Sequence, residues 1–225
     1  MKAGVPSNNS ITILASGGAD SAVLLDWAIK KYRRVHPVYV KQGYCWEKAE
    51  IYWLKKFLRQ ISRGGRGEGG LGKLKILEAP MGDVLKNHWS LNSRKVPGVR
   101  SSDKAVYLPG RNLFLFSKAA AFCAEKGIGS FAVGSLKGNP FSDARPLYFR
   151  GLEKIFHQSL GFAVKIKSPF VGWKKKDVLH YGRGLPFHLT FSCLNPRGIK
   201  SCGRCNKCAE RIKVFSSFPP SPAIP

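Results

Sequence analysis

A turn rich in glycine and serine near the start of the chain has the residue types that hold a phosphate group. It reads Ser16-Gly17-Gly18-Ala19-Asp20-Ser21 and directly follows the apolar run 11–15. Glycines let the backbone approach a ligand, while free N–H groups and the dipole of a following helix favour an anion. The hydroxyls of Ser16 and Ser21 add hydrogen bonds, and Asp20 can hold Mg²⁺ between phosphate oxygens. A turn that binds nothing is the alternative, but the complete string predicts a nucleotide site.

Four of the six cysteines gather near the C-terminus. Eight residues separate Cys193 from Cys202, and two residues separate each of Cys202, Cys205 and Cys208 from the next. In a chain without an export signal, such a cluster indicates a metal site before it indicates disulfides. Four thiolates on tight turns suit tetrahedral Zn²⁺ in a structural role. An iron–sulfur cluster and a redox pair are the alternatives, and we expect zinc.

Several other charged residues follow apolar segments that we interpret as strands. Arg111 can reach a phosphate or a carboxylate with two hydrogen bonds, and Asn112 is placed to cap the helix 113–122. Asp143 and Arg145 flank one alanine, so an extended segment would point both into one pocket. An exposed, salt-bridged loop is the alternative for that pair.

Lysine side chains open a short helix at 174–176, where positive charge opposes the helix dipole. We therefore expect at least one of them to have an anionic partner, although a solvated face is the alternative for any single lysine. The loop 41–46 follows the second strand and is a candidate wall of the pocket. The segment 83–105 has no clear periodicity, as in many lids and substrate loops.

Strand and helix patterns alternate along residues 1–185. The apolar segments that we interpret as strands are separated by segments with helical spacing of apolar residues, and they are 11–15, 35–40, 74–79, 131–134 and 164–167. This order predicts an α/β fold with a doubly wound, mainly five-stranded parallel sheet. We expect a flexible glycine-rich insertion at 62–72, a small zinc module at 186–215 and a Pro-rich tail at 216–225.

Composition limits the class of protein. The chain has 225 residues, 44% of them hydrophobic, with no apolar run of the length that a membrane span needs. Nothing in 1–9 resembles a secretory signal, so we expect a cytoplasmic protein. The net charge of +25 would favour weak contact with RNA, a secondary expectation because the basic residues are scattered.

The turn at 16–21 resembles the PP-loop of the ATP pyrophosphatase superfamily, which holds the pyrophosphate released when ATP is split. Three further segments follow in the same order: YLPGRN at 107–112, Asp143-Ala144-Arg145-Pro146, and TFSC…CGRCNKC at 190–208. Together they resemble the ExsB (QueC-like) family of 7-cyano-7-deazaguanine synthases, from the first strand to Cys208. The resemblance implies an adenine nucleotide α-hydrolase-like fold and the cofactors ATP, Mg²⁺ and Zn²⁺. The oligomeric state stays open, with a homodimer as one possibility.

The resemblance also implies a role for each matching residue. The ATP phosphates would be held by the turn, through Ser16, Gly17, Gly18, Asp20 and Ser21. Arg111 and Asn112 would line the nucleotide and substrate pocket, Asp143 and Arg145 would contact the substrate, and Lys175 would neutralise phosphate charge. The zinc ligands would be Cys193, Cys202, Cys205 and Cys208.

The reaction implied by the resemblance joins 7-carboxy-7-deazaguanine to ammonia at the expense of ATP. Adenylation makes the carboxylate an electrophile, and ammonia then gives the amide. A second adenylation, of the amide oxygen, lets that oxygen leave to form the nitrile. Such an enzyme mainly positions its reactants and neutralises phosphate charge. Whether AMP or ADP is the final nucleotide product stays open.

Two features depart from the family pattern and keep alternatives open. The family usually carries Gln-Arg-His after the second strand, whereas this chain has Gln42-Gly43-Tyr44-Cys45-Trp46, and the glycine-rich insertion and high charge are unusual. One alternative is a QueC-like enzyme that joins an activated deazapurine to another amine. A PP-loop enzyme of tRNA thiolation that uses Cys45, and a zinc-knuckle protein that binds RNA without catalysis, are the others.

Overall fold

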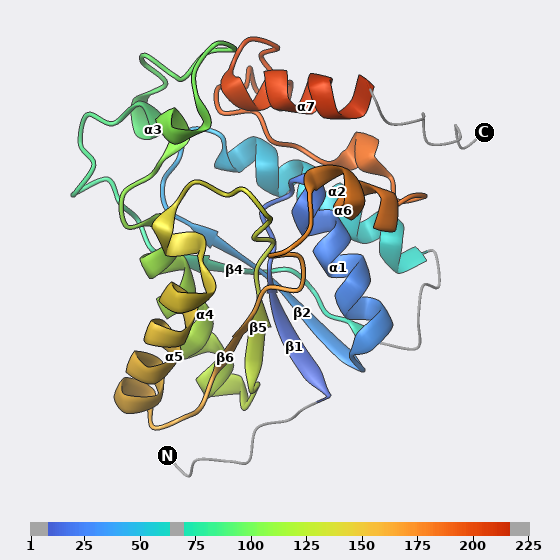
Figure 1. The fold of residues 1–225 in the computed structure, drawn as a ribbon, viewed down its shortest axis with the longest axis vertical. Coiled ribbons are helices and arrows are strands. Elements are labelled where there is room, and N and C mark those ends of the chain that lie inside the picture. The colour runs from blue at the N-terminus through green and yellow to red at the C-terminus, as the bar shows by residue number, and fades with distance from the viewer. Residues whose placement is uncertain (1–8, 64–69, 217–225) are drawn as a thin grey trace.

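A single parallel sheet organises the structure, a computed structural model that describes residues 9–63 and 70–216 (Figure 1). Its strands are β1 (Ser10–Leu14), β2 (Arg34–Lys41), β3 (Gly70–Leu71), β4 (Lys75–Glu78), β5 (Ser130–Ala132) and β6 (Lys165–Lys167). The helices are α1 (Ala19–Lys31), α2 (Glu47–Arg63), α3 (Trp89–Asn92), α4 (Arg111–Lys126), α5 (Pro146–Leu160), α6 (Lys175–Tyr181) and α7 (Asn206–Ser216).

The strand order places β1 at the centre of the sheet, between β2 and β5. The order is β3-β2-β1-β5-β6, and β4 also pairs with β2, along its second half. Because β3 pairs with the first residues of β2, β3 and β4 together fill one edge position. The expected five-stranded parallel sheet is thus confirmed, with one edge strand interrupted.

Helices cover both faces of this sheet, as a doubly wound fold requires (Figure 1). One core packs α1, α2 and α6 against the sheet around Val23, Leu24 and Phe57, all nearly inaccessible. A second core lies between the sheet and the pair α4 and α5, around Phe116 and Phe131. Burying each such side chain contributes about 1.5–3 kcal/mol. These two cores fix the position of the carboxyl ends of the strands.

The cysteine segment shares a third core with loops of the sheet domain. Tyr44 and Trp46 from the β2–α2 loop and Leu108 pack with Phe191 and with buried cysteines. Figure 1 shows α3 and α7 lying beyond the carboxyl ends of the strands. This core joins residues on both sides of the expected domain boundary between 185 and 186. That boundary stays a prediction.

Two local expectations were wrong. Gly110, with φ of 71°, is the N-cap of α4, so Arg111 and Asn112 lie in the first helical turn and Asn112 does not cap it. Asp143 lies in a short 3₁₀ turn, Ser142–Ala144, rather than in an extended segment. The two helical turns begin after Gly110 and after Phe141, earlier than the side chains of Asn112 and Asp143 suggest.

The expected insertion at 62–72 is only partly a loop. Residues 64–69 lie outside the described part of the chain, but 62 and 63 continue α2, and Gly70 donates a 2.8 Å hydrogen bond to the carbonyl of Arg33. Gly70 and Leu71 thereby form β3. None of the helices in 9–63 and 70–216 is long and apolar enough to cross a membrane.

Candidate active site at the carboxyl edge of the sheet

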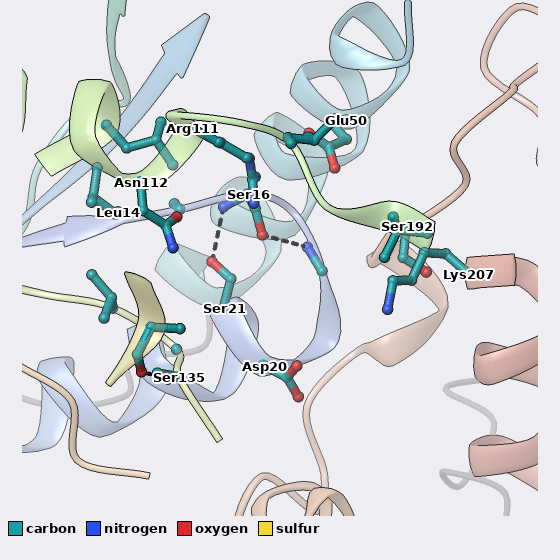
Figure 2. Close-up of a pocket in the computed structure, with 18 of the residues that line it drawn as sticks. Leu14, Ser16, Asp20, Ser21, Glu50, Arg111, Asn112, Ser135, Ser192 and Lys207 are labelled. Carbon is teal, nitrogen blue, oxygen red and sulfur yellow. Dashed lines mark hydrogen bonds between the residues drawn. The ribbon is translucent and has the colours of Figure 1, made fainter. Parts of the chain in front are cut away.

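A cavity of about 400 Å³ lies beyond the carboxyl ends of β1, β2 and β5 (Figure 2). The turn after β1, the first turn of α4 and the start of α7 all contribute to its wall. The loop 41–46, expected as a wall of the pocket, contributes Gln42, Tyr44 and Trp46 to the lining. Of the residues to which the resemblance gave a role at the nucleotide or substrate, those that line the cavity are Ser16, Gly18, Asp20, Ser21, Arg111, Asn112 and Lys175. The structure therefore brings together residues that are far apart in the chain, as ligand binding at this edge requires.

The turn after β1 is held in shape by its own hydroxyls. The N–H of Ser16 donates to Oγ of Ser21 at 3.0 Å, and the N–H of Gly18 donates to Oγ of Ser16 at 3.4 Å (Figure 2). Gly17 has φ of 82°, and a Cβ there would lie 3.2 Å from the carbonyl oxygen of Glu50. A side chain at Gly17 would therefore be strained in conformation and crowded against α2.

A chain of ion pairs connects this turn with α6 and α7. Lys175 Nζ lies 2.7 Å from Asp20 Oδ2 and 3.5 Å from Glu210 Oε1, and Lys207 Nζ lies 2.7 Å from Glu210 Oε2. The expectation that one of the lysines 174–176 has an anionic partner is confirmed. Both lysines line the cavity, so their charge is available to an anion there.

Asp20 has one oxygen in this network and one without a hydrogen-bond partner. Its Oδ1 is buried and unpartnered in the described part of the chain. Burial raises the pKa of Asp20, although Lys175 opposes the shift. Burial alone would lower the pKa of Lys175, but the carboxylates of Asp20 and Glu210 raise it. A buried, unpartnered carboxylate oxygen beside a phosphate cradle fits a divalent cation such as Mg²⁺.

Arg111 and Asn112 reach the cavity from the first turn of α4. The carbonyl of Arg111 accepts a 3.4 Å hydrogen bond from the side-chain amide of Gln42. Its Nε is buried and makes no hydrogen bond within the described residues. The side-chain amide of Asn112 donates to the carbonyl of Asp143 at 3.3 Å. Arg111 thus brings an unused donor and a positive charge to the cavity.

Asp143 and Arg145 do not share the cavity as expected. Neither lines it, although Ala144 between them does. Arg145 is exposed, and Asp143 has a buried Oδ1 without a partner in the described residues. Burial raises the pKa of Asp143. Because the 3₁₀ turn replaces an extended segment, alternate positions no longer face the same side.

The sequence reasoning missed a buried glutamate in the cavity wall. Glu50 is 8% exposed, lines the cavity, and accepts a 2.7 Å hydrogen bond from the hydroxyl of Tyr39. Burial raises its pKa to about 8, against the opposing influence of Tyr39 and Arg111. A usable signal was present, because Glu50 lies four residues before Leu54 on the apolar face of the helix.

The loop 42–46, whose sequence departs from the family pattern, contributes aromatic rings to the cavity wall, but its cysteine does not line the cavity. Tyr44 stacks on Trp46 with centroids 4.8 Å apart, and Trp46 stacks on Trp89 at 5.6 Å. All three line the cavity, whereas Cys45 does not. Burial raises the pKa of the Cys45 thiol. Because a reactive sulfur needs a lowered pKa, this environment argues against a thiolation role for Cys45.

The four C-terminal cysteines form a cluster suited to a metal ion. The Sγ atoms of Cys193, Cys202, Cys205 and Cys208 all lie within 4.8 Å of one another. Ligand sulfurs lie about 3.8 Å apart around tetrahedral zinc, given Zn–S bonds of about 2.3 Å. The N–H groups of Leu194 and Asn195 donate to these sulfurs at 3.4 Å, as expected for thiolates. The donor set and its spacing fit one closed metal site.

Comparison with known proteins identifies the family. The model of "Queuosine biosynthesis protein QueC" matches residues 10–218. A 7-cyano-7-deazaguanine synthase of Leptospira interrogans is 31% identical over 223 residues, which cover 93% of this chain and 87% of that protein. Another, from Persephonella marina, is 31% identical and covers 93% of each chain. Among solved structures, the U34-tRNA thiolase NcsA from Methanococcus maripaludis has 13% identity and a TM-score of 0.48, covering 96% of this chain and 69% of that one. The chain belongs to the QueC family of queuosine biosynthesis proteins.

Proposed function

We propose that this chain converts 7-carboxy-7-deazaguanine and ammonia to 7-cyano-7-deazaguanine with ATP. The family match and the names of its curated relatives support this reaction. The cavity gives the strongest structural support. Its wall combines the turn that is shaped by Ser16 and Ser21 with the positive charges of two lysines and Arg111. That arrangement suits the triphosphate of ATP together with a carboxylate.

Two lysines from α6 and α7 would neutralise the leaving pyrophosphate beside the turn. Lys175 and Lys207 supply positive charge, and the carboxylates of Asp20 and Glu210 hold both ammonium groups in place. A phosphate would meet ammonium groups that these ion pairs already hold in position, and donors positioned in advance are the main source of electrostatic catalysis. Mg²⁺ bound through Asp20 would supply further charge between phosphate oxygens.

The start of α4 would hold the acid. The guanidinium of Arg111 can bind a carboxylate or the α-phosphate, because its Nε has no partner in the described residues. Asn112 lines the same wall and orients the 3₁₀ turn through the carbonyl of Asp143. Asp143 and Arg145 would contact substrate only at the rim of the site, through movement of that turn.

The direct test uses ammonium labelled with heavy nitrogen. Purified protein with ATP, Mg²⁺ and the acid should release a nitrile that carries the label, detected by mass spectrometry, together with a nucleotide product. The nucleotide product identifies AMP or ADP by chromatography. Failure to form any labelled product from this acid, with metal-loaded and folded protein, would remove the proposal.

A second function keeps the activation step and changes the amine. The aromatic wall of Tyr44, Trp46 and Trp89 favours it, since these rings line the cavity where the family pattern differs. A larger amine could pack its apolar part against such rings. Competition between ammonium and primary alkylamines at equal concentration decides the matter: a preference for ammonium over every larger amine excludes this function.

We also propose which metal the chain holds, which partners it has and where in the cell it acts. We assign zinc to the four-cysteine site on the chemistry of its thiolates. The proposal also includes a cytoplasmic enzyme, a homodimer and weak RNA contact through the net charge of +25. Metal analysis and sedimentation of the purified chain test the zinc and the dimer.

A further inference from the structure

The cavity is lined by four carboxylates in the described part of the chain, and their surroundings differ. Asp20 and Glu210 are paired with lysines. Glu47 accepts backbone N–H bonds at both oxygens, from Gln42 at 2.6 Å and from Gly43 at 3.1 Å. Glu50 has a single bond, from Tyr39 to Oε2, so Oε1 is without a hydrogen bond among the described residues. Among these four carboxylates, Glu50 is the one that makes neither an ion pair nor a hydrogen bond to the backbone among the described residues.

The position of Glu50 places it beside the turn that would hold the nucleotide. The carbonyl oxygen of Glu50 approaches Gly17 so closely that a Cβ on Gly17 would lie 3.2 Å from it. Figure 2 shows Glu50 behind the turn, near Ser16 and Arg111. An acid adenylated at this turn would thus have its reactive carbon near the wall that Glu50 forms.

The amine substrate presents a chemical requirement that the turn and the lysines do not meet. At neutral pH, ammonia in water is mostly ammonium, which has no lone pair with which to attack. A site that uses it must bind a cation and remove one proton, and a carboxylate in a protected cavity performs both tasks. The lysines and Arg111 would repel ammonium instead.

We infer, on the basis of the proposed function, that Glu50 binds the ammonium ion through Oε1 and takes a proton from it. Ammonium gives one proton to the carboxylate, which leaves ammonia and a neutral carboxyl group. The nitrogen lone pair then forms the C–N bond to the acyl carbon. The C–O bond to the phosphate breaks, AMP leaves with that electron pair, and the nitrogen loses one further proton to solvent. Glu50 releases its proton before the next cycle.

The charged groups around Glu50 suit this role. Tyr39 from β2 and Arg111 from α4 stabilise the carboxylate, while Glu47 on the same helix and burial oppose it. The resulting pKa of about 8 is close to that of an amine, so the proton can move in either direction at modest cost. Tyr39 also restricts the side chain, because its hydroxyl occupies Oε2 and leaves Oε1 for the amine.

The test separates activation of the acid from attack by the amine. Without ammonium, the wild type should exchange labelled pyrophosphate into ATP when the acid is present, which reports the proposed function alone. Glu50→Gln should keep this exchange, while its kcat/KM for ammonium falls about 100-fold or more. Hydroxylamine is neutral at pH 7 and needs no base, so E50Q should use it as fast as the wild type does.

The matched control is Glu153→Gln, a glutamate that accepts a hydrogen bond from the backbone N–H of Ile166 and lies outside the cavity. It should change neither amine reaction. An unchanged kcat/KM for ammonium in E50Q, or an equal loss with ammonium and hydroxylamine, would overturn the role of Glu50. If the wild type shows no acid-dependent exchange, the proposed function fails instead.

A second variant keeps the inference testable if E50Q folds poorly. Tyr39→Phe removes the bond that lowers the pKa of Glu50, so the pKa should rise further. The pH at which kcat/KM for ammonium increases should therefore move to higher values, while the profile with hydroxylamine stays unchanged. Identical ammonium profiles for Y39F and the wild type would contradict the inference.

Discussion

Among single residues, the charged side chains that connect the turn with α7 form the ion pairs that would meet the phosphates of ATP. Lys175 is flanked by Asp20 and Glu210, so removing its charge leaves two carboxylates facing the cavity. Both would repel the phosphates of ATP. We therefore predict that nucleotide binding depends strongly on the positive charge of Lys175.

Lys175→Gln should lower kcat/KM for ATP by about 100- to 1000-fold, the range for loss of one pre-positioned charge donor. Lys176→Gln is the matched control, because Lys176 is exposed and does not line the cavity. Steady-state kinetics of acid-dependent pyrophosphate exchange give the comparison. Equal kinetics for the two variants would show that the charge at 175 is not used.

The buried carboxyl of Glu50 predicts how stability depends on pH. Its pKa rises from an ordinary 4.5 to about 8 on folding, so the folded chain binds more protons than the unfolded chain between those values. The free energy of unfolding should fall as pH rises through this window, and level off above pH 8. Glu50→Gln lacks this contribution. Urea denaturation from pH 5 to 9 should show the wild type losing stability relative to E50Q, and a constant difference would contradict the shift.

The sequence predicted the residues of the site where local pattern and chemistry coincide. The turn at 16–21 and the four cysteines each have short, characteristic spacing, and the structure brings each set together. Glu50 and Lys207 were missed because their use depends on contacts between distant elements. Asp143 and Arg145 were misplaced because two-residue spacing positions side chains only if the backbone is extended.

At the scale of elements, α1 and α6 pack closely where α6 ends. A Cβ on Gly182 would lie 2.5 Å from Val23 and 3.1 Å from Leu185. Gly182→Ala should therefore lower the free energy of unfolding by about 1–3 kcal/mol, as overpacking does. Gly151 lies within α5 with no atom near its missing Cβ, so Gly151→Ala should stabilise by about 0.5–1 kcal/mol. Denaturant melts of both variants check the pair, and a shift of the same sign in both would contradict the packing.

The four-cysteine cluster and the turn after β1 are linked through α7. Cys208 and Lys207 are neighbours in the first turn of this helix, and Glu210 follows within it. Loss of the metal should release the start of α7 and with it two members of the ion-pair chain. Chelation should therefore lower the affinity for ATP, measured by calorimetry, and readdition of zinc should restore it. Unaltered ATP affinity in the metal-free, still folded chain would contradict this link.

The boundaries of the regular elements were predicted better than the connections between them. The apolar runs at 11–15 and 35–40 placed β1 and β2 within one residue at each end, because burial on a sheet face imposes its own periodicity. The segment 83–105 contains α3 and the start of a 3₁₀ turn, Asp103–Val106, and the sequence shows no periodicity that predicts either of them. Such short turns depend on what they pack against, here the core formed with the cysteine segment.

At the scale of the whole molecule, the fold class followed from the alternation of strands and helices, and the position of the site followed from the fold. In a doubly wound sheet, β1 lies at the centre and its carboxyl end faces the cavity. The net charge of +25 has no such consequence for the fold, since charge acts on association and solubility. It is consistent with a site built for polyanionic nucleotides, but a far smaller charge would serve that purpose.

We propose that the acid is activated when its carboxylate attacks the α-phosphate of ATP at the turn of Ser16 and Ser21. The most direct measurement starts from the acid labelled with heavy oxygen in its carboxylate and follows the label by mass spectrometry. Each carboxylate oxygen should leave attached to the phosphate of AMP, since the first adenylation removes one and the second removes the other. Recovery of the label in water or in pyrophosphate, with unlabelled AMP, would contradict the account.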